Sequence, residues 1–89
     1  MIQAMKTIWK WTLNQLEEMI DMPDGAKILT VQEQYGKPQI WALVDPDARR
    51  SGRTFHVYGT GHNLLDDPGR YVGTVQACGE RAVWHVFEK

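Results

Sequence analysis

The chain has little of what stabilises small secreted domains or marks membrane segments. Its single cysteine, Cys78, allows no internal disulfide and no paired Cys/His spacing for structural zinc. No stretch approaches the roughly 18 apolar residues of a membrane helix, and the first residues lack the apolar core of a signal peptide. We therefore expect a protein of a reducing, cytoplasmic compartment that has no membrane association.

An excess of charge of one sign is also missing. The chain carries 10 Lys and Arg against 11 Asp and Glu, which gives a formal net charge of −1. No overall field therefore attracts nucleic acid or acidic membranes, and such binding would need a local patch. The one basic cluster comprises Arg49, Arg50 and Arg53, and the nearby Asp45 and Asp47 reduce its net field. Nucleic-acid binding through these three arginines is the least favoured function.

The 89 residues contain no repeat, linker or low-complexity tract, so they form one domain, 1–89, of which residues 1–5 are expected to be flexible. Short stretches of alternating apolar and β-branched residues, separated by turn signals, predict six or seven strands. The clearest of them are 6–13, 26–34, 39–44, 53–58, 70–78 and 81–87. This pattern predicts an all-β fold, either a small antiparallel β-sandwich or a partly open barrel.

Two hairpins are the clearest local features. The first joins 26–34 to 39–44, and its second arm is apolar on both faces, which predicts a central strand. The second joins 70–78 to 81–87. Gly73, inside the second hairpin, predicts a bulge or a place where another side chain lies on the backbone.

Residues 14–21 fit two structures. Asn14 followed by Glu17 is typical of a capping box that opens a short helix. The same residues could form a turn that leads into an edge strand around 19–22. Either structure ends at Pro23-Asp24-Gly25, and the sequence leaves both open.

The segment with the most candidate functional side chains runs into a two-glycine loop. Alternation places Phe55 and Val57 toward the core and His56 and Tyr58 on a polar face. The loop Gly59-Thr60-Gly61 could let backbone N–H groups approach a phosphate, but it has neither GxxxxGK[ST] nor GxGxxG spacing, and acidic residues follow it. A turn with positive φ is the preferred interpretation.

A pocket around Tyr58–His62 that binds or hydrolyses a nucleotide-like anion is the second functional hypothesis. Its ligand-binding residues would be Arg53, His56, Tyr58, Thr60, His62 and His85. A histidine beside Asp66 or Asp67 could act as a general base. The histidines form no HxH or HxxxH pair, so we assign no metal, no cofactor and no catalytic residue.

Two of these side chains have simpler interpretations. His85 lies between apolar residues in a predicted strand, where a partly buried, hydrogen-bonded histidine is the default. Cys78 could be a nucleophile with His56 or His85 as its base, but a lone cysteine at a strand end is more often a small hydrophobic residue.

The first functional hypothesis is a non-enzymatic protein-binding module. Four tryptophans exceed what so small a core needs, and large aromatic rings are enriched at interfaces. We expect Trp9 and Trp11, or an open sheet edge, to mediate self-association into a homodimer. Whether the protein is also an enzyme stays open, since no catalytic pattern favours it.

Several segments together resemble a family of small proteins of unknown activity that are encoded by phages, prophages and bacteria. The segments are Lys6–Lys10, Met22–Leu29, Trp41–Pro46, Tyr58–His62, Tyr71–Thr74 and Trp84–Phe87. The resemblance runs from about Lys6 to Glu88. It implies no activity, cofactor or catalytic residue. It implies a setting in the cytoplasm of a bacterial host and binding to a host or phage component, with the blunting of a defence system as one use.

Overall fold

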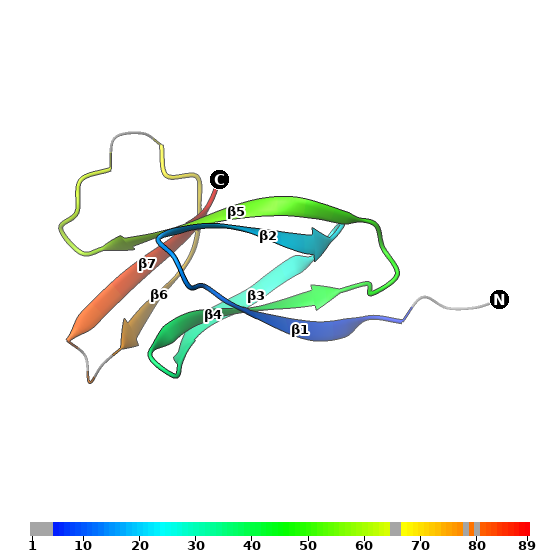
Figure 1. Ribbon diagram of the computed structural model, residues 1–89, viewed down its shortest axis with the longest axis horizontal. Helices are drawn as coiled ribbons and strands as arrows, with labels where there is room; N and C mark the ends of the chain where they lie inside the picture. Colours follow the sequence, from blue (N-terminus) through cyan, green and yellow to red (C-terminus); the bar gives the residue numbers. More distant parts are fainter. Residues whose placement is uncertain (1–4, 65–66, 78, 80) are drawn as a thin grey trace.

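The computed structural model describes residues 5–64, 67–77, 79 and 81–89, which form seven strands and no helix (Figure 1). The strands are β1 (Thr7–Thr12), β2 (Glu17–Pro23), β3 (Lys27–Gln34), β4 (Lys37–Val44), β5 (Arg50–Gly59), β6 (Arg70–Ala77) and β7 (Ala82–Glu88). The all-β class that alternation predicts is confirmed. The interpretations of residues 1–4, Asp66 and Cys78 lie outside the described residues.

The strands form two antiparallel sheets that enclose one core. The smaller sheet has the order β1-β4-β3, and the larger has the order β2-β5-β7-β6. Strand β4 is central and pairs with β1 and β3, as its apolar sequence predicts. Both predicted hairpins, β3–β4 and β6–β7, are present. The fold is therefore a small β-sandwich.

The helix alternative for residues 14–21 is wrong, because Glu17–Pro23 form strand β2. In β2, Ile20 and Met22 are buried while Met19 and Asp21 are exposed, a period of two that suits a strand and not a helix. The carboxylate of Glu18 accepts a hydrogen bond from the backbone N–H of Asn14 at 2.7 Å. Glu18, one residue after the Glu17 of the predicted capping box, therefore closes a turn that leads into an edge strand.

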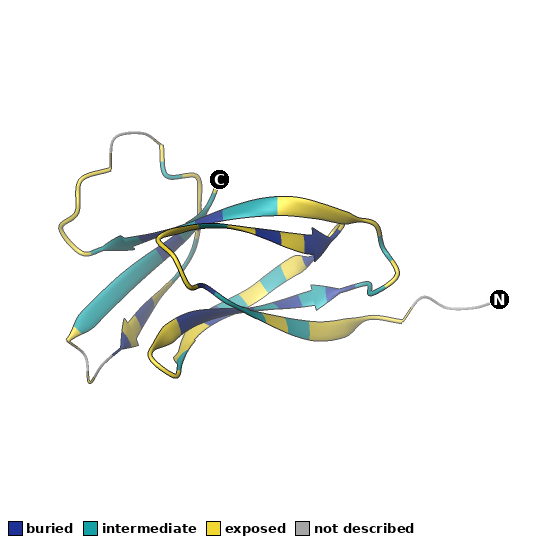
Figure 2. Ribbon diagram, in the orientation of Figure 1, coloured by how far each residue is buried: buried dark blue, intermediate teal, exposed yellow. Residues whose placement is uncertain are grey.

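The core lies between the sheets and draws side chains from both, as the buried segments in Figure 2 show. Phe55, Met22 and Ile40, from three different strands, are fully buried. Full burial of one such side chain stabilises the fold by about 1.5–3 kcal/mol. None of the four tryptophans is fully buried; three half-buried ones pack against the core, namely Trp9, Trp11 and Trp84.

One margin of the sandwich is closed by β3 and β6, which lie side by side although they belong to different sheets. Each strand has a register shift there, between Ile28 and Thr30 in β3 and between Tyr71 and Gly73 in β6. A methyl group on Gly73 would stand 2.5 Å from Cγ1 of Val31. The predicted bulge and the predicted close contact at Gly73 are both confirmed.

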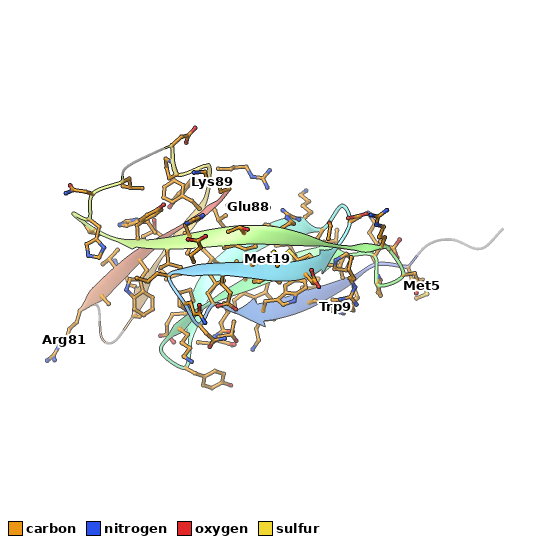
Figure 3. The ribbon with its side chains drawn as sticks, turned by 45° about the horizontal axis from the view of Figure 1, so that its top comes forward. Met5, Trp9, Met19, Arg81, Glu88 and Lys89 are labelled. Atoms are coloured by element: carbon orange, nitrogen blue, oxygen red, sulfur yellow. The ribbon has the colours of Figure 1, made fainter. Side chains whose placement is uncertain are left out.

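Three charged side chains tie the larger sheet to the start of β3. Nε and Nη2 of Arg53 donate to the Glu88 carboxylate at 2.5 and 2.8 Å, and Nη2 of Arg70 donates to it at 2.8 Å. Nη1 of Arg53 donates to the carbonyl oxygen of Ala26 at 2.6 Å. The hydrogen bond from Arg53 lowers the pKa of Glu88 against the opposing effect of burial, and Arg70 adds to the lowering. Figure 3 shows Glu88 near the end of the chain, where this cluster forms.

Candidate functional site

The outer face of the larger sheet carries most of the predicted site. Strand β5 buries Phe55 and Val57 against the core and turns His56 and Tyr58 outward, as alternation predicts. Both outward rings are half-buried because neighbouring rings cover part of each one. The sheet therefore presents ring surface where a solvated face would usually present polar side chains.

Ring contacts continue from β5 across β7 to β6. His56 and Tyr58 stack with ring centroids 6.1 Å apart and planes inclined by 7°. The ring of Phe87 meets Tyr58 edge-on at 5.9 Å and Tyr71 edge-on at 5.4 Å. This order follows the strand register, because Phe87 lies opposite both His56 and Tyr71. We call these four residues, together with His85, the aromatic face.

A line of hydrogen bonds runs beside the rings. Thr60 Oγ1 lies 2.7 Å from Nε2 of His85, and Thr74 Oγ1 lies 3.0 Å from its Nδ1. The Tyr71 hydroxyl lies 2.6 Å from Thr74 Oγ1. A neutral imidazole donates through one nitrogen and accepts through the other, so both nitrogens of His85 have partners. The prediction of a hydrogen-bonded histidine at position 85 is confirmed.

The two-glycine loop after β5 is a tight turn. The His62 N–H donates to the carbonyl oxygen of Gly59 at 3.2 Å, and Gly61 has a φ of 86°, which favours glycine. Gly59 serves a different purpose. Its N–H donates to Nδ1 of His62 at 3.2 Å, and a Cβ at Gly59 would stand 2.8 Å from Cε1 of that ring. The turn interpretation is confirmed for Gly61. Gly59 is needed because a side chain there would collide with the His62 ring.

A surface cleft of about 420 Å³ opens beside this turn. Its lining includes the predicted residues His56, Tyr58 and His62, together with Glu17 and Lys89. Thr60 and His85 do not line the cleft, since their side chains bond to each other along the sheet. Five of the six predicted pocket residues therefore divide between the cleft and the hydrogen-bonded line, and Arg53 lies in neither.

The predicted arginines lie at separate places. Arg53 points to the inner side of β5 and pairs with Glu88, away from His56 and Tyr58. Arg50 is exposed, and its guanidinium carbon lies 4.9 Å from the centroid of the Trp9 ring on β1. Arg49 is exposed in the segment just before β5. Arg53 is therefore not part of an exposed basic patch with Arg49 and Arg50.

The two tryptophans that we expected at an interface lie on the inner face of β1. Trp9 and Trp11 meet at a centroid distance of 6.1 Å with planes inclined by 67°. They lie opposite Ala42 and Ile40, both fully buried residues of β4. Each ring is half-buried, so each covers the core and also keeps exposed surface on β1, the edge strand opposite β3 in the smaller sheet.

Two kinds of site do not occur in the part of the chain that the structure describes. Among these residues, no three His, Cys, Asp or Glu side chains gather closely enough to hold a metal ion. The same residues include no helix long and apolar enough to cross a membrane.

Sequence reasoning did not identify Tyr71 and Phe87 as members of the site. Phe87 lies two residues after His85 in the same strand, so the period of two could have placed both on one face. The position of Tyr71 beside Phe87 depends on the β6–β7 register, which the bulge before Gly73 shifts. No pattern within β5 indicates that β7 is its neighbour.

Comparison with known proteins places the chain in a family. A family model described as a domain of unknown function (DUF7352) matches residues 5–89, and the chain belongs to this family. No curated protein and no solved structure matches the chain.

Proposed function

We propose that this protein is a non-enzymatic protein-binding module that contacts its partner through the aromatic face. One observation carries the proposal: partly exposed rings touch one another across three neighbouring strands, from His56 and Tyr58 through Phe87 to Tyr71. Tyr71 is the most open of them, with 57% of its surface exposed. Tyrosine is enriched among the residues that dominate binding energy at protein interfaces.

The chemistry of this face suits a protein partner better than a nucleic acid. The polar atoms of His85 are bonded to Thr60 and Thr74, so ring surface is what a partner would cover. Glu17 lies opposite His56 at the margin of the face, and its carboxylate would repel a phosphate backbone. The pairing of Arg53 with Glu88 also weakens the nucleic-acid hypothesis, because it removes one of the three arginines from the predicted patch.

Comparative capture from host lysate tests the proposal. The wild-type protein and the variant Tyr58→Ala/Tyr71→Ala are used as bait, with Tyr35→Ala as the control, because Tyr35 is 90% exposed and lies in the turn between β3 and β4, away from the larger sheet. We expect a protein that the wild type and the control enrich equally and that the double variant loses at least tenfold. Equal capture by all three baits would contradict the proposal. Loss of captured material after nuclease treatment would favour nucleic acid instead.

The cleft favours a second candidate function, the binding of a nucleotide-like anion. Its lining combines His56, Tyr58, His62 and Lys89, whose side chains can donate hydrogen bonds to phosphate, with the carboxylates of Glu17 and Asp67, which oppose the binding of an anion. Thermal-shift measurements with ATP, GTP and inorganic phosphate test it, with His62→Ala as the control variant. A ligand at 100 times its Kd should stabilise the wild type by about 2.7 kcal/mol. An unchanged Tm with every anion would remove this candidate.

We also propose a biological setting. The resemblance to phage and prophage proteins supports a phage-encoded protein that acts in the cytoplasm of a bacterial host. Its partner would then be a host or phage component, and one use of the binding would be to blunt a defence system. Production of the protein during infection, followed by immunoblotting of the fractionated host, tests the setting. Its absence from the cytoplasmic fraction would contradict it.

A further inference from the structure

The two margins of the sandwich differ in how they are covered. Strands β3 and β6 are the outermost strands of their sheets at one margin, and they lie against each other. Strands β1 and β2 are the outermost strands at the other margin, where no described strand pairs with their outer edges. Free edges of this kind are ready to pair with another chain unless they are protected.

Exposed apolar side chains gather on these two strands and on the turn between them. Ile8 of β1 is 56% exposed, Met19 of β2 is 68% exposed, and Leu16 just before β2 is 71% exposed. The half-buried rings of Trp9 and Trp11 add apolar surface at the same margin. Figure 3 shows Met19 and Trp9 on these neighbouring strands. This concentration of apolar surface is typical of an interface.

The charges of the two strands are opposite in sign. Lys10 on β1 and Lys6 just before it are the charged residues of that edge, and both are exposed. Nζ of Lys10 donates to Gln34 at 2.8 Å, an exposed hydrogen bond that it would exchange for a carboxylate in the seam. Strand β2 carries only acids, namely Glu17, Glu18 and Asp21. Pairing of β1 with a second β1, or of β2 with a second β2, would set like charges along the seam, which is destabilising. Pairing of β1 with β2 sets lysines against carboxylates.

We propose that the protein forms a symmetric dimer in which β1 of each copy pairs with β2 of the other. Figure 1 shows β1 and β2 running in opposite directions, so a two-fold axis along the strands makes both new pairings antiparallel. Each smaller sheet then continues into the larger sheet of the second copy. The seams cover Ile8, Met19 and the open sides of Trp9 and Trp11. A second copy is the occupant that the charges specify, because the chain itself supplies both complementary edges.

This dimer does not depend on the aromatic face. The face lies on the outer side of β5, β7 and β6, and the seams lie at β1 and β2. The dimer therefore leaves the face open to a partner. The variant Tyr58→Ala/Tyr71→Ala is expected to remain dimeric, so the failure of one proposal is distinguishable from the failure of the other.

Charge reversal tests the pairing. One variant carries Lys6→Glu/Lys10→Glu, another carries Glu17→Lys/Asp21→Lys, and a third carries all four substitutions. The control, Lys27→Glu/Lys89→Glu, changes the same number of lysines away from β1 and β2. Molecular mass is measured by light scattering at about 100 µM protein, where a dimer with a micromolar Kd is assembled. Circular dichroism confirms that each variant is folded.

We expect the wild type and the control to be dimers and each two-site edge variant to be a monomer. The four-site variant, and an equimolar mixture of the two edge variants, should recover the dimer because lysine again faces carboxylate in both seams. A monomeric wild type would overturn the proposal. So would a dimer that only the β1 variant disrupts, because it would indicate a β1–β1 seam. Failure of the four-site variant to recover the dimer while folded would also overturn it.

Discussion

The two sheets expose aromatic rings on their outer faces in different ways. On the smaller sheet, Nζ of Lys10 lies 5.9 Å from the ring centroids of both Tyr35 and Trp41 and donates to Gln34 at 2.8 Å. On the larger sheet, the rings of the aromatic face contact chiefly one another. The cation over two rings keeps the outer face of the smaller sheet polar. In the described part of the chain, the rings on the outer face of the larger sheet carry no such cation and stay free to bind.

The hydrogen-bond networks of the two sheets also differ, because one is neutral and the other is ionised. Gln39 on the smaller sheet is only 2% exposed, and it accepts a hydrogen bond from Thr12 at 2.6 Å and donates to the Gln34 carbonyl at 3.0 Å. This network is neutral. The larger sheet holds the ionised cluster of Arg53, Glu88 and Arg70. Acid should therefore weaken the larger sheet's network and spare that of the smaller sheet.

The largest expected effect is a difference in stability between substitutions on the two faces of β5. Phe55→Ala removes a fully buried ring and should lower the free energy of unfolding by about 4 kcal/mol, because a cavity remains in the core. Tyr58→Ala, on the outer side, should cost about 1 kcal/mol from lost ring contacts. Urea unfolding monitored by tryptophan fluorescence measures both. Similar costs would mean that the outer rings are structural, which would weaken the assignment of the aromatic face to binding.

A smaller effect is expected from Glu88→Gln. It should cost about 2 kcal/mol at neutral pH, chiefly because Arg53 loses a charged partner in a mostly buried place, while the exposed Arg70 contributes little. The folded pKa of Glu88 is lowered, so its stabilisation is complete above the unfolded pKa of about 4.3 and is lost as pH falls through the folded pKa. The wild type should therefore lose more stability than the variant between neutral and acid pH.

Unfolding free energies measured from pH 7 down through the acid range give this comparison. Gln39→Leu is the matched variant on the smaller sheet. It should lower stability by the same amount at every pH, since its network contains no ionisable group. Parallel pH profiles for the wild type and Glu88→Gln would contradict the role of the ionised cluster.

The smallest effect concerns the cation over the rings of the smaller sheet. Lys10→Met keeps the apolar stem but removes the charge, and it should cost about 0.5 kcal/mol, the usual size of an exposed cation–π contact. Lys6→Met removes a charge from the same edge without a cation–π contact, and at a protein concentration low enough to dissociate the proposed dimer it should be neutral. Thermal unfolding of both variants at equal concentration measures the difference. Equal Tm values would show that Lys10 adds nothing to this face.

Local patterns accounted for much of the fold. Alternation within β5 assigned Phe55 and Val57 to the core and His56 and Tyr58 to the surface, and both hairpins were predicted from short-range turn signals. Such predictions succeed because side-chain direction in a strand alternates residue by residue, and a turn depends on a few backbone dihedrals. Residues 14–21 were ambiguous because Asn14 and Glu17 match a helix cap locally, whereas the burial of Ile20 against the core made them a strand.

The candidate site was only partly predictable. His56, Tyr58 and His62 are close in sequence, so one strand and one turn bring them to the same cleft. Phe87 and Tyr71 join them through the pairing of β7 with β5 and β6, which no short segment encodes. Arg53 was assigned to the polar site from its position in β5, and its partner, Glu88, lies 35 residues away.

Three glycines separate what the sequence alone determined from what the tertiary structure decided. Gly61 occupies a turn that needs a positive φ, and the sequence alone determined this, because the requirement comes from four consecutive residues. Gly59 and Gly73 are needed because the His62 ring and the Val31 side chain lie against them. For Gly73 and for the face formed by β5, β7 and β6, the tertiary structure decided which surfaces meet. The physical reason is that pairing between distant strands depends on the burial of the whole core and not on the preferences of any one segment.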